Sequence, residues 1–189
     1  MGIRDRTETR LLDAAEEMFF TRGVAATPVD VILDRAGISS ATLYRGYPSK
    51  EALVAAALDR RHATWLAEWD AAVAASTTPV GALLAVFDAL DGFRSRPEGA
   101  RWCAFLGTAA EYAAPPAELA EALARETTAY RERLTRFATD AGAADPAALA
   151  AQLLLVISGD LAMRLRTPDA TTADARAIAE ILVRADCRR

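Results

Sequence analysis

Apolar residues recur along this chain at the three- and four-residue spacing of amphipathic helices. Val29, Ile32, Leu33 and Ala36 show the pattern clearly, because they fall on one face of a helix. The chain has 189 residues, and its hydrophobic content of 52% comes largely from alanine, a strong helix former, while runs of β-branched residues are scarce. The pattern predicts an all-α fold with enough residues to bury a full core.

Proline, glycine and small polar residues mark where these helices begin and end. Besides two short helices within residues 27–48, the expected helices cover roughly residues 7–22, 50–75, 79–93, 102–112, 115–141, 146–166 and 172–185. The long helix that begins at Lys50 would join an N-terminal group of three helices to the rest of the chain.

Residues 27–50 carry the most specific local signals. Thr27 is expected to cap a helix that opens with Pro28, and Gly37 to end it in a left-handed conformation. Ser39 is expected to cap a second helix directly afterwards. Two short helices joined by so tight a turn form a helix-turn-helix, a motif that places its second helix in the major groove of DNA.

The second helix of this motif offers the chemistry that base edges and phosphates require. Short polar side chains and arginine read bases in the major groove, and residues 37–50 contain two cations, Arg45 and Lys50, and no acid. The alternative is an ordinary helical hairpin with a solvated polar face. The expected DNA-contacting residues are Thr27, Ser39, Ser40, Thr42, Tyr44, Arg45, Tyr47 and Lys50.

The order of these signals resembles the N-terminal domain of the TetR family of transcriptional regulators. The resemblance rests on the Ala-Gly-Ile-Ser turn at residues 36–39, Thr-Leu-Tyr at 42–44 and Ser-Lys-Glu-Ala-Leu at 49–53, within a match that covers about residues 9–58. It implies a helix-turn-helix DNA-binding domain in residues 1–48 and a helical ligand-binding and dimerisation domain in residues 49–189.

The resemblance also implies a function. TetR-like regulators bind a palindromic operator as homodimers, usually as repressors, and a small-molecule inducer releases them. One departure is that Gly46 stands where relatives commonly carry histidine or an aromatic residue. A helical protein-interaction module with weakened or lost DNA binding therefore remains the alternative.

The two expected C-terminal helices carry more apolar residues than a terminal hairpin needs to cover its own domain. We interpret their apolar faces as a dimer interface in which two helices meet their symmetry mates as a four-helix bundle, which is also where TetR-like proteins dimerise. The alternative is that both faces belong to the core of the single chain. The interface residues would be Leu149, Leu153, Val156, Ile157, Leu161, Ile178, Ile181 and Leu182.

A ligand pocket is expected where aromatic side chains enclose the interior of the helical bundle. Aromatic residues at helical spacing are also ordinary core residues, so this assignment is less specific than that of the helix-turn-helix. The expected pocket residues are Trp65, Trp69, Phe87, Trp102, Cys103, Phe105, Glu111, Tyr112, Tyr130 and Arg131.

Charge and residue usage argue against several other classes of function. The net charge of −4 lies wholly in residues 63–189, with 13 basic against 17 acidic residues, which argues against a general nucleic-acid coat. A single histidine, His62, and two scattered cysteines show no pattern of catalytic or metal-ligating residues. We therefore expect a cytoplasmic protein that is not an enzyme, with no cofactor, metal site or membrane span.

Overall fold

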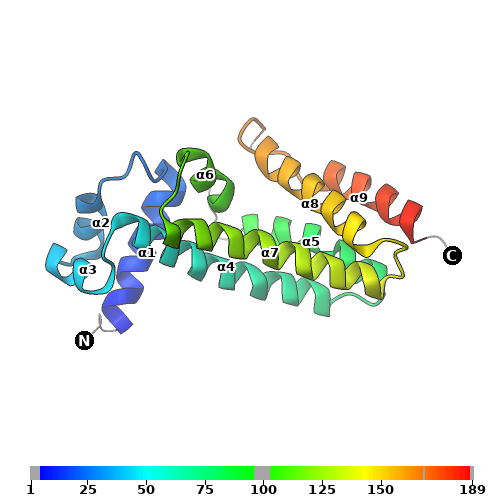
Figure 1. Cartoon of the computed structure of the whole chain (residues 1–189), viewed down its shortest axis with the longest axis horizontal. Coiled ribbons are helices and arrows are strands. Elements are labelled where there is room, and N and C mark those ends of the chain that lie inside the picture. The colour runs from blue at the N-terminus through cyan, green and yellow to red at the C-terminus, as the bar shows by residue number, and fades with distance from the viewer. Residues whose placement is uncertain (1–4, 96–102, 168, 188–189) are drawn as a thin grey trace. The chain divides into compact units, whose positions relative to one another are not determined.

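A computed structural model describes residues 5–95, 103–167 and 169–187. These residues form nine α-helices and no strand, which confirms the predicted all-α class (Figure 1). The expected helix ends agree with the observed ones to within a few residues. The helices are α1 (Asp5–Arg22), α2 (Val29–Ala36), α3 (Ser40–Gly46), α4 (Lys50–Ala74), α5 (Pro79–Arg94), α6 (Ala104–Glu111), α7 (Ala117–Asp140), α8 (Pro146–Met163) and α9 (Ala173–Asp186).

The chain divides into two compact units. The N-terminal unit comprises residues 1–63 and 100–124, and the C-terminal unit comprises residues 64–99 and 125–189. The helices α4 and α7 each contribute one part to each unit. This division rests on packing. It differs from the predicted boundary between a DNA-binding domain and a ligand-binding domain, which lies between residues 48 and 49 and stays a prediction.

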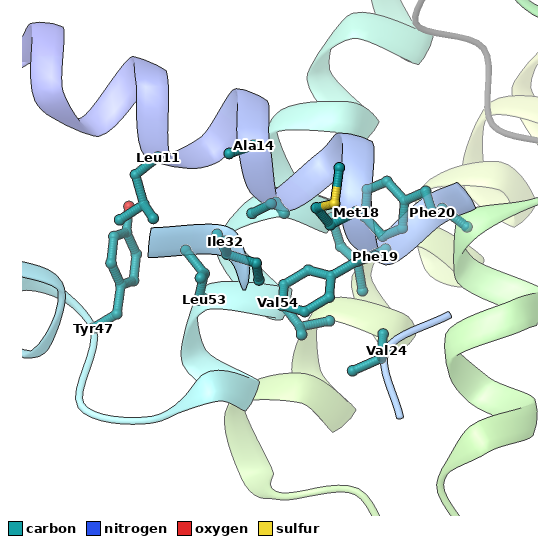
Figure 2. Packing of buried hydrophobic residues seen from close by; sticks show 14 of the residues in the cluster. Leu11, Ala14, Met18, Phe19, Phe20, Val24, Ile32, Tyr47, Leu53 and Val54 are labelled. Carbon is teal, nitrogen blue, oxygen red and sulfur yellow. The ribbon is translucent and has the colours of Figure 1, made fainter. Parts of the chain in front are cut away.

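The core of the N-terminal unit forms around α1. Its side chains Leu11, Ala15 and Phe19 are at most 1% exposed, and they pack with Ile32 of α2 and Leu53 of α4 (Figure 2). Burying large aliphatic and aromatic side chains stabilises the fold by about 1.5–3 kcal/mol each. This cluster therefore holds the helix-turn-helix in place on α1 and the first part of α4.

The segment between α1 and α2 differs from its prediction. Thr27 was expected to cap α2, but the N-cap position is occupied by Pro28, and no side chain makes a capping hydrogen bond there. Thr27 is instead 1% exposed, and its hydroxyl donates a hydrogen bond to the carbonyl of Gly23 at 2.7 Å. The prediction was wrong because a buried hydroxyl needs a partner, and that of Thr27 finds it in the carbonyl directly after α1 instead of in the N–H groups of α2.

The core of the C-terminal unit gathers α4, α5, α7, α8 and α9. Trp69 and Phe87 are among its largest fully buried side chains. Leu149, Leu153 and Ile157 of α8 belong to the same core and are at most 1% exposed. Their assignment to the dimer interface was therefore wrong, because these three side chains cover the interior of the chain's own bundle.

Candidate nucleic-acid interface

The turn between α2 and α3 is built by two residues whose roles the sequence predicted. Gly37 has a φ of 63° in the left-handed region, where glycine carries no steric penalty. The N–H of the next residue, Ile38, donates to the carbonyl of Leu33 at 3.1 Å. This bond gives a hydrogen-bond partner to a carbonyl in the last turn of α2. Ser39 then caps α3, since its Oγ accepts the N–H of Thr42 at 3.3 Å.

This turn sets which face of α3 is buried. Leu43 is fully buried against the core of the N-terminal unit, whereas Tyr44 on the other face is 54% exposed. Ser40 and Arg45 are also exposed, and neither side chain has a hydrogen bond or ion pair with another residue that the structure describes. The helix therefore presents a hydroxyl, a phenol and a guanidinium to solvent, which are the groups that contact bases and phosphates in a DNA groove.

Tyr47 lies in the core rather than on this exposed face. It is 9% exposed, and its hydroxyl points toward α1, where it donates to Glu8 Oε1 at 2.6 Å (Figure 2). Burial and the neighbouring carboxylate raise the pKa of the Tyr47 phenol, so the hydroxyl stays protonated and able to donate at neutral pH. Tyr47 thus anchors the segment after α3 to α1, and we withdraw it from the set of expected DNA contacts, together with the buried Thr27.

Lys50 is partly exposed and also makes a hydrogen bond within the protein. Its Nζ donates to the backbone carbonyl of Val24 at 2.6 Å and lies 5.9 Å from the centre of the Phe19 ring, so the side chain is half-buried. An ammonium group has three donors, and the bond to Val24 uses one of them. The residue ties the start of α4 to the loop before α2 and keeps donors for a phosphate.

The expected pocket residues are distributed over both units. Within the C-terminal unit, Trp65, Trp69, Phe87 and Tyr130 are buried in the core, while Arg131 is exposed on α7. The other described members, Cys103, Phe105, Glu111 and Tyr112, belong to the N-terminal unit. Trp102 lies outside the described residues.

Glu111, at the end of α6, has a specific structural role that sequence reasoning missed. Its carboxylate accepts the backbone N–H groups of Val24, at 3.0 Å, and Ala25. The preceding residue, Gly23, has a φ of 94°, and a Cβ there would lie 3.2 Å from Glu111 Oε1. The acid thus satisfies two backbone donors in the turn after α1. No sequence signal connects residues 87 positions apart.

Most of the exposed large apolar side chains of the C-terminal unit lie on α8 and α9, which pack side by side (Figure 1). Leu155 is 74% exposed, Ile181 62% and Ile178 51%. Ile178 and Ile181 were predicted as interface residues, and the predicted residues Val156, Leu161 and Leu182 are half-buried. An unpartnered apolar face of this kind is typical of an interaction surface.

The same helix α8 is the one described helix that is long and apolar enough to cross a membrane, with a mean hydropathy of 1.6 over 18 residues. Length and composition alone do not distinguish a membrane span from a helix shared between a core and an interface. Here Leu149 and Leu153 on one side of α8 pack inside the C-terminal unit. Part of the apolar character of α8 therefore comes from its contribution to the core of the C-terminal unit.

Comparison with known proteins agrees with this geometry. Residues 11–57 match the family model described as bacterial regulatory proteins of the tetR family. The HTH-type transcriptional activator FasR of Mycolicibacterium smegmatis is 46% identical over 57 residues, which cover 30% of this chain and 26% of FasR. The HTH-type transcriptional repressor KstR2 of Rhodococcus jostii is 50% identical over 46 residues, covering 24% of this chain and 22% of KstR2. The matches thus span about a quarter of the length of each relative.

Solved structures extend the likeness to the remaining helices. SCO4454, a TetR-family transcriptional regulator from Streptomyces coelicolor, superposes with a TM-score of 0.87 at 28% sequence identity, and the match covers 98% of both chains. The family match lies in α1 to α4, and the structural match extends over nearly the whole chain. Residues 11–57 therefore form a TetR-family domain, and the chain as a whole has the fold of a TetR-family transcriptional regulator.

Proposed function

We propose that the protein is a sequence-specific DNA-binding repressor that binds a palindromic operator as a homodimer and is released by a small-molecule ligand. The observation that carries the proposal is the exposed face of α3, where Ser40, Tyr44 and Arg45 point to solvent while Leu43 anchors the helix in the core. An α-helix held in this way fits the major groove, about 12 Å wide.

Phosphate contacts would come from the ends of neighbouring helices. Lys50 opens α4, and the first turn of a helix offers free N–H groups and a positive dipole end. The hydroxyls of Ser39 and Thr42 lie 3.0 Å apart at the start of α3, where they can donate hydrogen bonds to phosphates of the DNA backbone. Such contacts set the orientation of a protein on DNA, while the contacts of α3 with bases set its sequence preference.

A dimer formed through α8 and α9 would require an operator with matching symmetry. Two symmetric subunits carry two copies of α3, so half-sites related by a twofold axis are expected, one or more helical turns apart. Leu155, Ile178 and Ile181 supply the exposed apolar surface for this contact. A protein that acts on chromosomal DNA in this way would be cytoplasmic.

Release by a ligand requires only that the ligand prefer one arrangement of the dimer. If the preferred arrangement spaces the two α3 helices wrongly for the operator, DNA affinity falls by the ligand's differential affinity for the two states. Repression requires only that the bound dimer occlude a promoter. Of the two relatives, KstR2 is named a repressor and FasR an activator.

Selection of bound duplexes from a random pool at about 100 mM salt tests the proposal. Enrichment of a palindromic sequence, bound by two chains per duplex, would support it. A promoter carrying that sequence ahead of a reporter should then be silenced when the protein is present. A failure to enrich any sequence would shift the proposal to a helical protein-interaction module.

A further inference from the structure

Three aromatic rings of the C-terminal unit form a contiguous cluster. Trp65 of α4 stacks on Tyr130 of α7 with ring centres 5.7 Å apart and planes 12° from parallel. Trp69, one turn further along α4, contacts both rings at 5.7 Å and 5.1 Å. All three side chains are buried, since Trp65 is 6% exposed, Trp69 0% and Tyr130 5%.

Hydrogen-bond donors in this cluster outnumber their acceptors. The indole Nε1 atoms of Trp65 and Trp69 are buried, and neither finds an acceptor among the residues that the structure describes. Arg133 of α7 adds a third such donor, its Nε, while its guanidinium lies 4.7 Å from the centre of the Trp69 ring. Another nitrogen of the same guanidinium pairs with Asp70.

Three unpaired buried N–H groups in one cluster are costly for a core that serves packing alone. Each buried donor without a partner destabilises the fold, and phenylalanine at the two tryptophan positions would supply aromatic surface without that cost. Binding sites, in contrast, combine apolar and aromatic walls with a few polar groups that wait for a partner.

We propose that this cluster binds the ligand that releases the protein from DNA, and that the ligand is a planar aromatic compound carrying carbonyl or carboxylate oxygens. The inference rests on the proposed function and specifies the chemical class of its ligand. The rings of Trp65, Trp69 and Tyr130 provide stacking partners for a flat ring system. The unpaired N–H groups of Trp65, Trp69 and Arg133 provide donors for oxygen acceptors.

The donors also argue against a planar cation. Indole and guanidinium groups offer no acceptor to an ammonium ion, and Arg133 would repel it. Asp70 is paired with that arginine and its side chain is 64% exposed, so it does not supply a buried counter-charge within the cluster.

Binding of four naphthalene probes to the purified full-length protein tests the ligand class. The probes are 2-naphthoate, 2-acetylnaphthalene, 2-methylnaphthalene and the (2-naphthylmethyl)ammonium ion, with affinities measured by calorimetry or by quenching of tryptophan fluorescence. We expect the two oxygen-bearing probes to bind at least 10-fold more tightly than the methyl and ammonium probes. Equal affinities, tighter binding of the ammonium ion, or no binding up to 1 mM would overturn the inference.

Trp69→Phe and Trp65→Phe then test the indole donors separately from the rings. Each variant keeps an aromatic ring and removes one N–H group. We expect each to weaken the oxygen-bearing probes about 5- to 20-fold while changing the affinity of 2-methylnaphthalene less than twofold, with no fall in thermal stability. An equal loss for all probes, or no loss for any, would show that the indole N–H groups do not select the ligand.

These binding measurements need no DNA, so the two proposals fail separately. If the oxygen-bearing probes bind as expected but no duplex is enriched from the random pool, the ligand class stands and the proposed function falls. If a palindrome is enriched but the probes bind without the expected preference, the proposed function stands and the ligand class falls.

Discussion

The carboxylate of Glu111 accepts the backbone N–H of Val24 at 3.0 Å, joining the last residue of α6 to the turn that follows α1. The same carboxylate accepts the N–H of Ala25. One side chain from α6 thereby fixes the turn that leads from α1 toward α2, and a part of the chain far from the helix-turn-helix in sequence helps to hold it.

Replacing this acid should loosen the turn. Glu111→Ala leaves two backbone donors without their acceptor, and we expect the free energy of unfolding to fall by about 1 kcal/mol. The amide hydrogens of Val24 and Ala25 should exchange faster with solvent in the variant. Glu132→Ala, an exposed acid on α7, is the matched control and should change neither quantity. Unchanged exchange at both amides in Glu111→Ala would contradict the role assigned to this side chain.

The role of Tyr47 can be tested in the same way. Its buried position indicates that it stabilises the fold, whereas its place in the sequence predicts a contact with DNA. Tyr47→Phe removes the hydrogen bond to Glu8 and should cost about 1 kcal/mol of stability, while operator affinity changes less than twofold. Tyr44→Phe, which alters an exposed phenol on α3, is the control for stability and should leave it unchanged. Tenfold weaker DNA binding by Tyr47→Phe, with stability intact, would restore the original interpretation.

The local signals and the long-range contacts explain which parts of the fold could be predicted. Gly37 and Ser39 were read correctly because a left-handed turn residue and a helix cap depend on neighbours within a few positions. Thr27 and Tyr47 were not, because the Thr27 hydroxyl bonds to the carbonyl directly after α1 and the Tyr47 hydroxyl to Glu8 of α1, and the sequence alone does not reveal these partners. Helix existence was predictable from periodicity, whereas the choice among partners for a buried polar group depends on the packed structure.

The C-terminal helices show the same limit for apolar residues. Periodicity identified an apolar surface on α8, but it could not tell which side faces the core. Leu153 proved to be buried and Leu155, two positions later, to be 74% exposed. When a helix is apolar nearly all round, only the placement of its neighbours decides which residues remain for a second chain.

Charge placed on the exposed apolar face should separate the subunits. Ile181→Lys puts an ammonium group at a position that is 62% exposed in the single chain and apolar in the proposed interface. We expect the dimer dissociation constant to rise at least 100-fold in analytical ultracentrifugation, with the helical content retained. Val80→Lys, at an exposed valine of α5, should leave association unchanged. An unaffected dimer in Ile181→Lys would place the interface elsewhere.

Glu126 predicts a specific dependence of stability on pH. Burial raises the pKa of this carboxyl from 4.5 to about 7, because desolvation disfavours the charged form. Between these values the folded protein binds the proton more tightly than the unfolded chain does, so the contribution of Glu126 to stability falls as pH rises from about 4.5 to about 7 and stays lower above it.

Glu126→Gln should remove that dependence. We expect the variant to be more stable than the wild type at pH 8 by on the order of 1–2 kcal/mol, after allowing for partial exposure to solvent, and nearly equal to it at pH 4.5. Denaturant unfolding at the two pH values measures the difference, with Glu132→Gln as the exposed control. The same difference between Glu126→Gln and wild type at both pH values would show that the carboxyl does not titrate in this range.

The central claim is that the exposed face of α3 reads DNA, and titration of the selected duplex against salt tests it most directly. The wild-type dimer should bind with an affinity that falls linearly with salt on logarithmic axes, as release of counterions from phosphates requires. The double variant Tyr44→Ala/Arg45→Ala should bind at least 100-fold more weakly while remaining a folded dimer, whereas Arg131→Ala on α7 should bind like the wild type. A double variant with wild-type affinity and the same dependence on salt would contradict the claim.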